Sequence, residues 1–354
     1  MESVQNINGT PLSGKYNFAL DITKFVCALL VIVIHTRPFA GYSDILDFYT
    51  VNVIARIAVP LFYAISGYLF FSKLRYQDGK IAKCAENRAK LLKYLKRIAF
   101  LYVGWSVVYI IFQLPQWYKT GWWGKTLVKD CIVSFFFKGS YYHLWYLLAL
   151  LYGLPVLYLL LSFFSVRNVR FLFPILWLIE CLLYSYSWIG IDRLPALSWL
   201  TGHFPVFFDA FFRAIPLLGV GLLCIENTKR PPKLCFYTLL SASACVTEAS
   251  ILYFCTANDG KYSYIFFTPI AAYFLLSSLL CLKKSGNARL GALCRKSSLV
   301  IYCLHPLILQ SFKYLGSNSG ILLWILVTFS SVFIAVLWVV IKAGVHRRSE
   351  IALK

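Results

Sequence analysis

A chain of 354 residues would ordinarily hold two or three soluble domains, but its composition excludes a water-soluble fold. Hydrophobic residues make up 60% of the chain and charged residues only 14%, whereas a soluble domain is about a quarter charged. A formal net charge of +21 is also typical of proteins that bind nucleic acid, so the positions of the charges along the chain must decide what the charge is for.

Apolar runs of roughly 20 residues recur along the chain, and each is long enough to cross about 30 Å of hydrocarbon. The sequence therefore predicts an all-α integral membrane protein, a bundle of about ten transmembrane helices. They form one transmembrane domain at residues 17–342, between tails at 1–16 and 343–354. We expect the helices at 17–39, 49–72, 93–114, 143–165, 168–189, 205–225, 234–255, 262–282, 297–315 and 320–342.

The basic residues are unevenly divided between the two sides of this predicted bundle. With the N-terminus inside, the cytoplasmic segments hold 24 lysines and arginines and the external segments hold 8. That bias is the positive-inside pattern, so we expect both termini to be cytoplasmic. The positive charge then reflects topology and contact with a lipid bilayer, and nucleic acid is not an expected partner.

The first predicted helix carries ionisable residues that are costly at bilayer depth, where each is a functional-site hypothesis. Asp21 and Lys24 lie in its cytoplasmic half, and His35 lies near its external end. Lys24 and His35 are eleven residues apart, which is about 16 Å along a helix and close to three turns, so they share one face. The alternative for Asp21 and Lys24 is a pair that only neutralises its own charge.

The predicted topology places other polar groups at the same external level as His35. Arg56, His143, Asp209 and Arg213 all belong to the outer parts of their helices. With His35 they could surround one outward-facing cavity, in which imidazole suits a general base and arginine suits an oxyanion or anionic substrate. The alternative for Asp209 and Arg213, spaced i, i+4, is a pair that only fixes helix packing.

The eleven cysteines fall mostly within the predicted helices and show no spacing typical of metal ligands. We therefore expect neither a disulfide framework nor a metal site, and we interpret these cysteines as small apolar packing residues.

Four segments together resemble a known family. The run Asp21-Ile-Thr-Lys24, then ten residues and His35, resembles the Arg/Lys-x10-His signature of the acyltransferase-3 family. The segment 59–68, which ends in Ser66-Gly67-Tyr, is similar to the aromatic-rich second helix of that family. Two later segments also resemble the family, in family order: His143-Leu-Trp145-Tyr-Leu, and Ile-Tyr302-Cys-Leu-His305-Pro.

The resemblance implies a membrane protein that moves an acyl group, by default acetyl, onto a glycan. It implies a cytoplasmic acyl-CoA as co-substrate, no bound cofactor, and an acceptor hydroxyl on an extracytoplasmic or lipid-linked glycan. A multi-pass protein of the bacterial cytoplasmic membrane fits this reaction. The segment from Arg56 to Pro60 is also similar to the membrane half of membrane-bound serine racemases.

The resemblance also implies roles for individual residues. His35 is the general base or a transient acyl carrier, Lys24 holds the donor with Asp21 beside it, and Ser66 and Gly67 permit a close approach to the first helix. Where the family has a cytoplasmic Arg-x-x-Arg motif, this chain has Lys93, Lys96 and Arg97 at somewhat different positions. They either bind CoA phosphates or only anchor the helix at the membrane surface. The acceptor-side candidates are Arg56, His143, Trp145, Asp209 and Arg213, with Tyr302 and His305 as further site residues.

A different class of function also fits these features: a transporter or exporter of a small polar metabolite without chemistry, including a serine-handling membrane domain. Such a protein has no reason to bind CoA.

Overall fold

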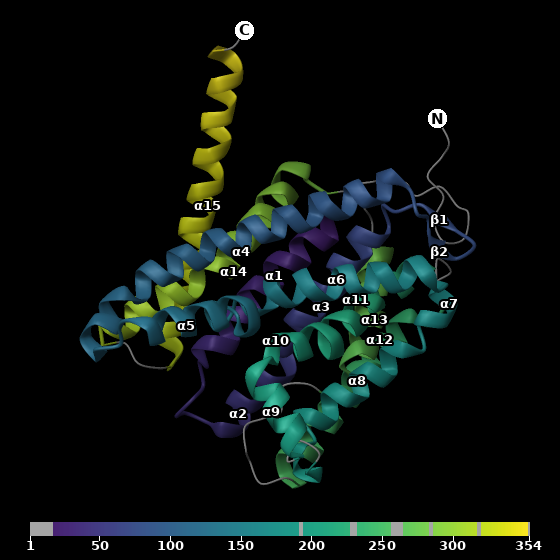
Figure 1. Cartoon of the computed structure of the whole chain (residues 1–354), viewed down its shortest axis with the longest axis horizontal. Coiled ribbons are helices and arrows are strands. Elements are labelled where there is room, and N and C mark those ends of the chain that lie inside the picture. Colours follow the sequence, from purple (N-terminus) through teal and green to yellow (C-terminus); the bar gives the residue numbers. More distant parts are fainter. Residues whose placement is uncertain are drawn as a thin grey trace. The chain divides into compact units, whose positions relative to one another are not determined.

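The computed structural model describes residues 17–190, 194–226, 232–255, 265–282, 286–316 and 320–352. Within these ranges the chain is almost entirely helical, as Figure 1 shows. The predicted tail at 1–16 and the last two residues of the predicted tail at 343–354 lie outside the described residues.

Eight helical stretches of the described chain are long and apolar enough to cross a membrane, so the predicted multi-pass α-helical fold is confirmed. They are Phe18–Thr36, Asp44–Phe71, Ala85–Thr120, Trp145–Phe163, Pro205–Glu226, Leu234–Cys255, Ala288–Tyr314 and Gly320–Lys342. The predicted segments 168–189 and 262–282 contain shorter helices, α8 (Leu172–Leu183) and α13 (Thr268–Cys281). Ten crossings, like the side of the membrane on which each terminus lies, remain a prediction.

Several of these stretches change helix type along their length. The second consists of α2 (Asp44–Phe48), a π-helix η1 (Tyr49–Ile54), a 3₁₀ turn η2 (Ala55–Ile57) and α3 (Ala58–Phe71). The fifth consists of α10 (Pro205–Phe208), a π-helix η6 (Asp209–Ala214) and α11 (Ile215–Glu226). Because π-helices are rare and recur at functional sites, both places are notable.

The other elements are single helices and short connections. They are α1 (Phe18–Thr36), α4 (Ala85–Thr120), α5 (Lys125–Val133), η3 (Ser134–Lys138), α6 (Trp145–Phe163), α7 (Val166–Val169), η4 (Ser187–Ile189), α9 (Pro195–His203), α12 (Leu234–Cys255), α14 (Ala288–Tyr314) and α15 (Gly320–Ala352).

By its internal contacts the described chain divides into two compact units. The first runs from Tyr63 to Ser278, and the second combines residues 17–62 with residues 279–352. Each unit has its own packing, and each holds part of the predicted site.

In the second unit, α1, α14 and α15 pack around one apolar cluster. Its buried members are Ala28, Ile32, Ile301, Ile308, Leu309, Leu323, Val327 and Ala335. At the start of α1 the Asn17 side chain accepts a hydrogen bond from the Leu20 amide at 3.3 Å, which satisfies a free helix N–H. At its end Arg37 adopts φ of 47° and terminates the helix. The Arg37 guanidinium then binds the buried Asp47 carboxylate of α2.

In the first unit, glycines let α3 and α11 approach closely. A Cβ on Gly67 would lie 2.3 Å from the Leu218 carbonyl oxygen, and one on Gly221 would lie 2.0 Å from the Ala64 carbonyl oxygen. Since real Cβ atoms do not come this close, only glycine fits at either position. The close approach expected of Gly67 is therefore an approach to α11.

The basic segment before α4 folds into a two-stranded hairpin, β1 (Tyr76–Gln77) and β2 (Lys80–Ile81), which the sequence analysis did not predict. Asp78 and Gly79 form its turn with φ of 50° and 71°, the left-handed pair that a two-residue hairpin turn requires. The Asn87 amide donates to the carbonyls of Arg75 and Ala82, and its oxygen accepts from the Arg75 amide. These bonds tie the hairpin to the first turn of α4.

Candidate functional site

The first half of α1 carries a charged group whose main partner comes from far along the chain. The Asp21 carboxylate, 5% exposed, accepts a hydrogen bond from an Arg295 guanidinium nitrogen of α14 at 2.8 Å. Lys24, one turn further along α1, is half-buried and near enough to act on the same carboxylate electrostatically. The ion pair within α1 that the sequence suggested thus includes a third member, Arg295.

The other end of α1 carries His35, the residue predicted to act as the general base. The imidazole of His35 stacks against that of His305 on α14, with ring centroids 5.4 Å apart and an angle of 26° between the planes. His305 is fully buried, and its Nδ1 lies 3.0 Å from the Ile301 carbonyl oxygen, one turn earlier. The ring of Tyr302 is also near His305, with 6.4 Å between the ring centroids. Three predicted residues, His35, Tyr302 and His305, therefore meet in one unit.

Two cations lie near this histidine pair. Arg56 of η2 and Lys313 of α14 both act electrostatically on His35. The Arg56 guanidinium donates to the Asn52 side-chain oxygen at 3.3 Å, one turn earlier in the distorted stretch before α3. This end of the second unit thus combines two imidazoles with two cations, a setting that favours an anion or a developing oxyanion.

A second buried polar cluster lies in the first unit. Arg213 of η6 binds two carboxylates: Asp209 at 2.8 Å, as the i, i+4 spacing predicted, and Glu180 of α8 at 2.7 Å from the guanidinium Nε. All three residues are at most 7% exposed. Two buried carboxylates around one guanidinium neutralise it, so Arg213 is poorly suited to the anion-binding role that the sequence suggested for it.

Aromatic rings lie beside two of the acceptor-side candidates of the first unit, Arg213 and His143. The Arg213 guanidinium lies 4.9 Å from the ring of Trp145 and 5.3 Å from that of Tyr184, distances typical of cation–π contact. His143, 2% exposed, precedes α6 and meets the rings of Tyr109, Tyr141 and Tyr142 at centroid distances of 5.0 to 5.8 Å. Trp145 therefore joins the Arg213 cluster, and His143 belongs to an aromatic cluster.

The donor-side candidates also lie in the first unit. Lys93, Lys96 and Arg97 are exposed on α4, and their i, i+3, i+4 spacing puts them on one face of the helix. The Ser66 side chain lies near the Tyr94 hydroxyl of α4, and the residue after Ser66, Gly67, packs on α11. Three exposed cations on one face suit a phosphate-bearing ligand, and they equally suit a surface at the membrane boundary.

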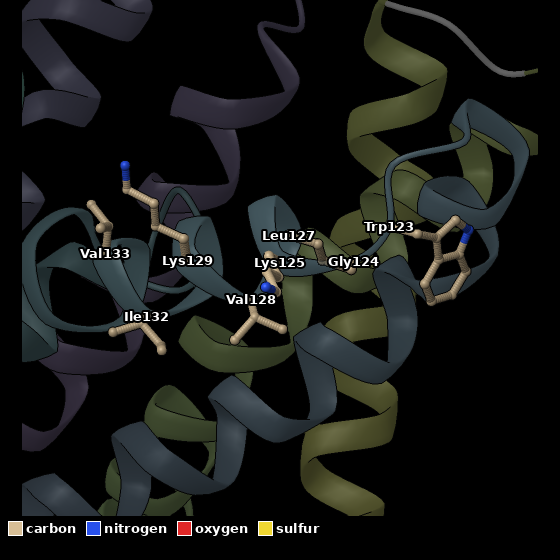
Figure 2. A pocket seen from close by; sticks show the side chains of 8 residues that line it. All are labelled: Trp123, Gly124, Lys125, Leu127, Val128, Lys129, Ile132 and Val133. Atoms are coloured by element: carbon tan, nitrogen blue, oxygen red, sulfur yellow. The ribbon is translucent and has the colours of Figure 1, made fainter.

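A shallow apolar groove of about 780 Å³ runs along α5 (Figure 2). It is lined by Trp123, Gly124, Lys125, Leu127, Val128, Lys129, Ile132 and Val133, and none of these is a predicted site residue. Exposed tryptophan and lysine beside valine and isoleucine are typical of a segment at a membrane–water interface. Among the described residues, no group of three or more His, Cys, Asp or Glu could hold a metal ion.

Sequence reasoning found the ionisable residues but not all of their partners. It did not single out Arg295, which was counted among the 24 basic residues of the predicted cytoplasmic segments, and no local pattern marks Glu180 as a partner of Arg213. A signal for Arg295 existed, since the predicted topology puts the starts of α1 and α14 on the same side of the membrane. The stacking of His305 on His35 had no sequence signal.

Comparisons with known proteins give a consistent result. A family model for an acyltransferase domain, that of the acyltransferase-3 family, matches residues 17–342. The chain is 26% identical over 304 residues to an amino-acid racemase of Enterococcus faecalis, covering 82% of this chain and 40% of that protein. It is 27% identical over 324 residues to a serine/alanine racemase of Enterococcus gallinarum, covering 86% and 43%. The chain thus spans less than half the length of these relatives. No solved structure matches it.

The Arg213 cluster makes a prediction about stability. Replacing Arg213 by leucine leaves Glu180 and Asp209 buried without their cation, and breaking a buried pair in this way typically costs about 3–5 kcal/mol. Denaturation of the purified protein in detergent should show a loss of that size, and adding Glu180→Gln should recover part of it. The control is Arg75→Ala, which removes an exposed partner of Glu86 and should cost less than about 1 kcal/mol. Equal stability of the Arg213→Leu and Arg75→Ala variants would contradict the cluster.

Proposed function

Because the chain belongs to the acyltransferase-3 family over residues 17–342, we propose that it is a membrane-embedded O-acyltransferase. The donor is a cytoplasmic acyl-CoA, by default acetyl-CoA, and the acceptor is a hydroxyl of an extracytoplasmic or lipid-linked glycan. The site of action is the bacterial cytoplasmic membrane. No bound cofactor takes part, because the thioester of the donor already carries the activated acyl group.

One observation carries this proposal: α1 holds a cation and an imidazole on one face, about 16 Å apart. Lys24 lies in the half that we assign to the cytoplasm, and His35 lies at the other end, stacked on His305 and near Arg56. A single helix thus presents a group for the donor and a group for the acceptor at different depths. This arrangement suits a reaction whose two substrates approach from opposite sides of a membrane.

We assign general-base catalysis to His35. Its ring nitrogen takes the proton of the acceptor hydroxyl while the oxygen attacks the thioester carbonyl carbon. The carbon–sulfur bond then breaks, the acyl group stays on the acceptor oxygen, and the proton passes from His35 to the leaving CoA thiolate. Arg56 is the cation placed to stabilise the oxyanion formed in between, because Arg213 already faces two carboxylates.

On the donor side we assign Lys24 to a phosphate or the pantetheine arm of CoA, and Lys93, Lys96 and Arg97 to its remaining phosphates. In this assignment Asp21 positions Lys24. Its stronger ion pair, with Arg295, fixes the carboxylate whether or not a donor is bound. On the acceptor side we assign Arg56, with the neutralised Asp209–Arg213 pair, His143 and Trp145 as further candidates.

The first test concerns His35. His35→Ala and His35→Gln should both lower acyl transfer about 10²–10⁴-fold, because neither side chain takes up a proton at neutral pH. Transfer of radiolabelled acetyl from acetyl-CoA to membrane glycan measures this. Thermal stability and CoA binding, measured on the same preparations, should stay close to wild type. If His35→Gln retains more than a modest fraction of the activity, His35 is not the general base.

The second test concerns Lys24. Lys24→Ala should weaken CoA binding roughly tenfold to a hundredfold, the value of a hydrogen bond to a charged group, and Lys24→Arg should largely keep the affinity. Calorimetry with CoA on purified protein measures both. Arg295→Ala serves as the control, because it removes the main partner of Asp21 and leaves Lys24 in place. It should clearly lower the free energy of unfolding and change the affinity for CoA only slightly. Unchanged CoA affinity in Lys24→Ala would leave this lysine a structural role only.

A second candidate function rests on the named relatives. The proteins that the chain resembles over less than half their length are an amino-acid racemase and a serine/alanine racemase. The shared segment could serve such a protein by binding or moving an amino acid across the membrane, without acyl transfer. The Arg213 cluster, with its excess of carboxylate, would then face the ammonium group of the amino acid.

Binding measurements separate the two functions. The acyltransferase should bind CoA and be indifferent to free serine or alanine. An amino-acid carrier should show the reverse, with uptake of labelled serine into proteoliposomes. Binding of serine without binding of CoA would replace the first function by the second.

A further inference from the structure

His305 is a fully buried ionisable residue that the proposed reaction does not use, and it faces the residue on which that reaction depends. We infer that His305 is a positioning residue, which fixes the plane of the His35 imidazole for proton transfer. This inference rests on the proposed function for its effect on rate, and on the geometry of the second unit for the contact itself.

The orientation of His305 is set by its own helix. Its Nδ1 lies 3.0 Å from the Ile301 carbonyl oxygen, and since a carbonyl can only accept, Nδ1 carries the proton and donates. The next residue, Pro306, has no N–H and cannot bond the Tyr302 carbonyl one turn earlier, so the continuous helix α14 lacks one backbone hydrogen bond next to the ring. A ring with a backbone anchor and no exposed surface has one orientation available.

Because the two rings stack, the fixed orientation of the His305 ring also restricts the orientation of the His35 ring. The two ring planes are within 26° of parallel and their centroids are 5.4 Å apart. The Nδ1 of His305 is engaged with the Ile301 carbonyl, so the His305 ring is held by its own helix. In this proposal His305 supplies a fixed ring against which the His35 imidazole is held.

The surroundings of the pair support a role in positioning. The side chains that act electrostatically on His35 include His305 and Lys313 from α14 and Arg56 from η2. In the Ser-His-Asp arrangement a second side chain beside the base holds its imidazole in place. In this proposal the imidazole of His305, which lies beside His35, has that part.

Variants at position 305 test the effect on catalysis. Leucine has nearly the volume of histidine but no ring plane, and phenylalanine keeps a plane without nitrogens. His305→Leu should lower kcat about tenfold to a hundredfold, with KM for donor and acceptor within about twofold, because a misoriented base costs turnover more than binding. His305→Phe should retain clearly more of the kcat than His305→Leu.

A matched control separates positioning from packing. Cys303→Ala changes an equally buried residue two positions earlier on α14, and it should lower Tm without lowering kcat. If His305→Leu lowers Tm alone, or if leucine and phenylalanine give the same kcat, then His305 is only a packing residue. Should His305→Leu fail to insert, His305→Gln, which keeps a donor for Ile301 but has no ring, replaces it.

A measurement without turnover separates this inference from the proposed function. The chain has five histidines, so the ring signals of histidine-labelled protein can be assigned by nuclear magnetic resonance through single replacements. His305→Leu should shift the His35 ring signals more than those of His143 or His203, and His305→Phe should shift them less than leucine does. Unmoved His35 signals would overturn the stacking. Shifted signals in a protein without transfer activity would keep the pair and reject the acyltransferase.

Discussion

Hydrocarbon offers no water to solvate a charge, so each ionisable side chain within the membrane must find its partner inside the protein. One charged group in each unit meets this constraint. Asp21 of α1 is held by Arg295 of α14, whose own side chain is partly exposed, and Arg213 of η6 is held by Asp209 of the same helix and by Glu180 of α8. Each group thus includes a partner from another helix. The helix pairs that meet are therefore specified by charge as well as by apolar packing, which on its own discriminates poorly between lipid and protein.

The parts of this architecture that could be read from the sequence are local ones. The helix at 234–255 begins and ends where it was predicted, because a run of apolar residues of that length has one stable conformation in a bilayer. The Asp209–Arg213 pair follows from spacing alone, since both residues belong to one helix. The hairpin before α4 was missed although its Asp-Gly turn is a known signal, because the basic residues around it drew the interpretation to topology.

The parts that the sequence could not provide depend on contacts between distant segments. Arg295 is 274 positions from Asp21, and no periodicity within either helix links them. His305 was recognised as a family residue, yet its ring plane relative to His35 depends on how α1 and α14 pack. Glu180 carried no local pattern at all. The sequence thus shows which buried charged residues need an oppositely charged partner. Which residue becomes that partner depends on how the helices pack.

The π-helix η6 has a consequence for how this protein can change over evolutionary time. A π turn is in effect an α-helix with one residue inserted, and the insertion falls on the segment Asp209–Ala214 that carries the cluster. Deletion of a single residue there would restore a regular helix of nearly the same length, still apolar enough to span the membrane. Because the wider π turn already accommodates the extra residue, the helical segments on either side would keep nearly the same orientation, and the change would fall on the residues of the turn itself. A lineage could in this way lose the Arg213 cluster in one step and keep a stable helical bundle. The fold would then be conserved while the chemistry changes, without any intermediate that fails to insert into the membrane.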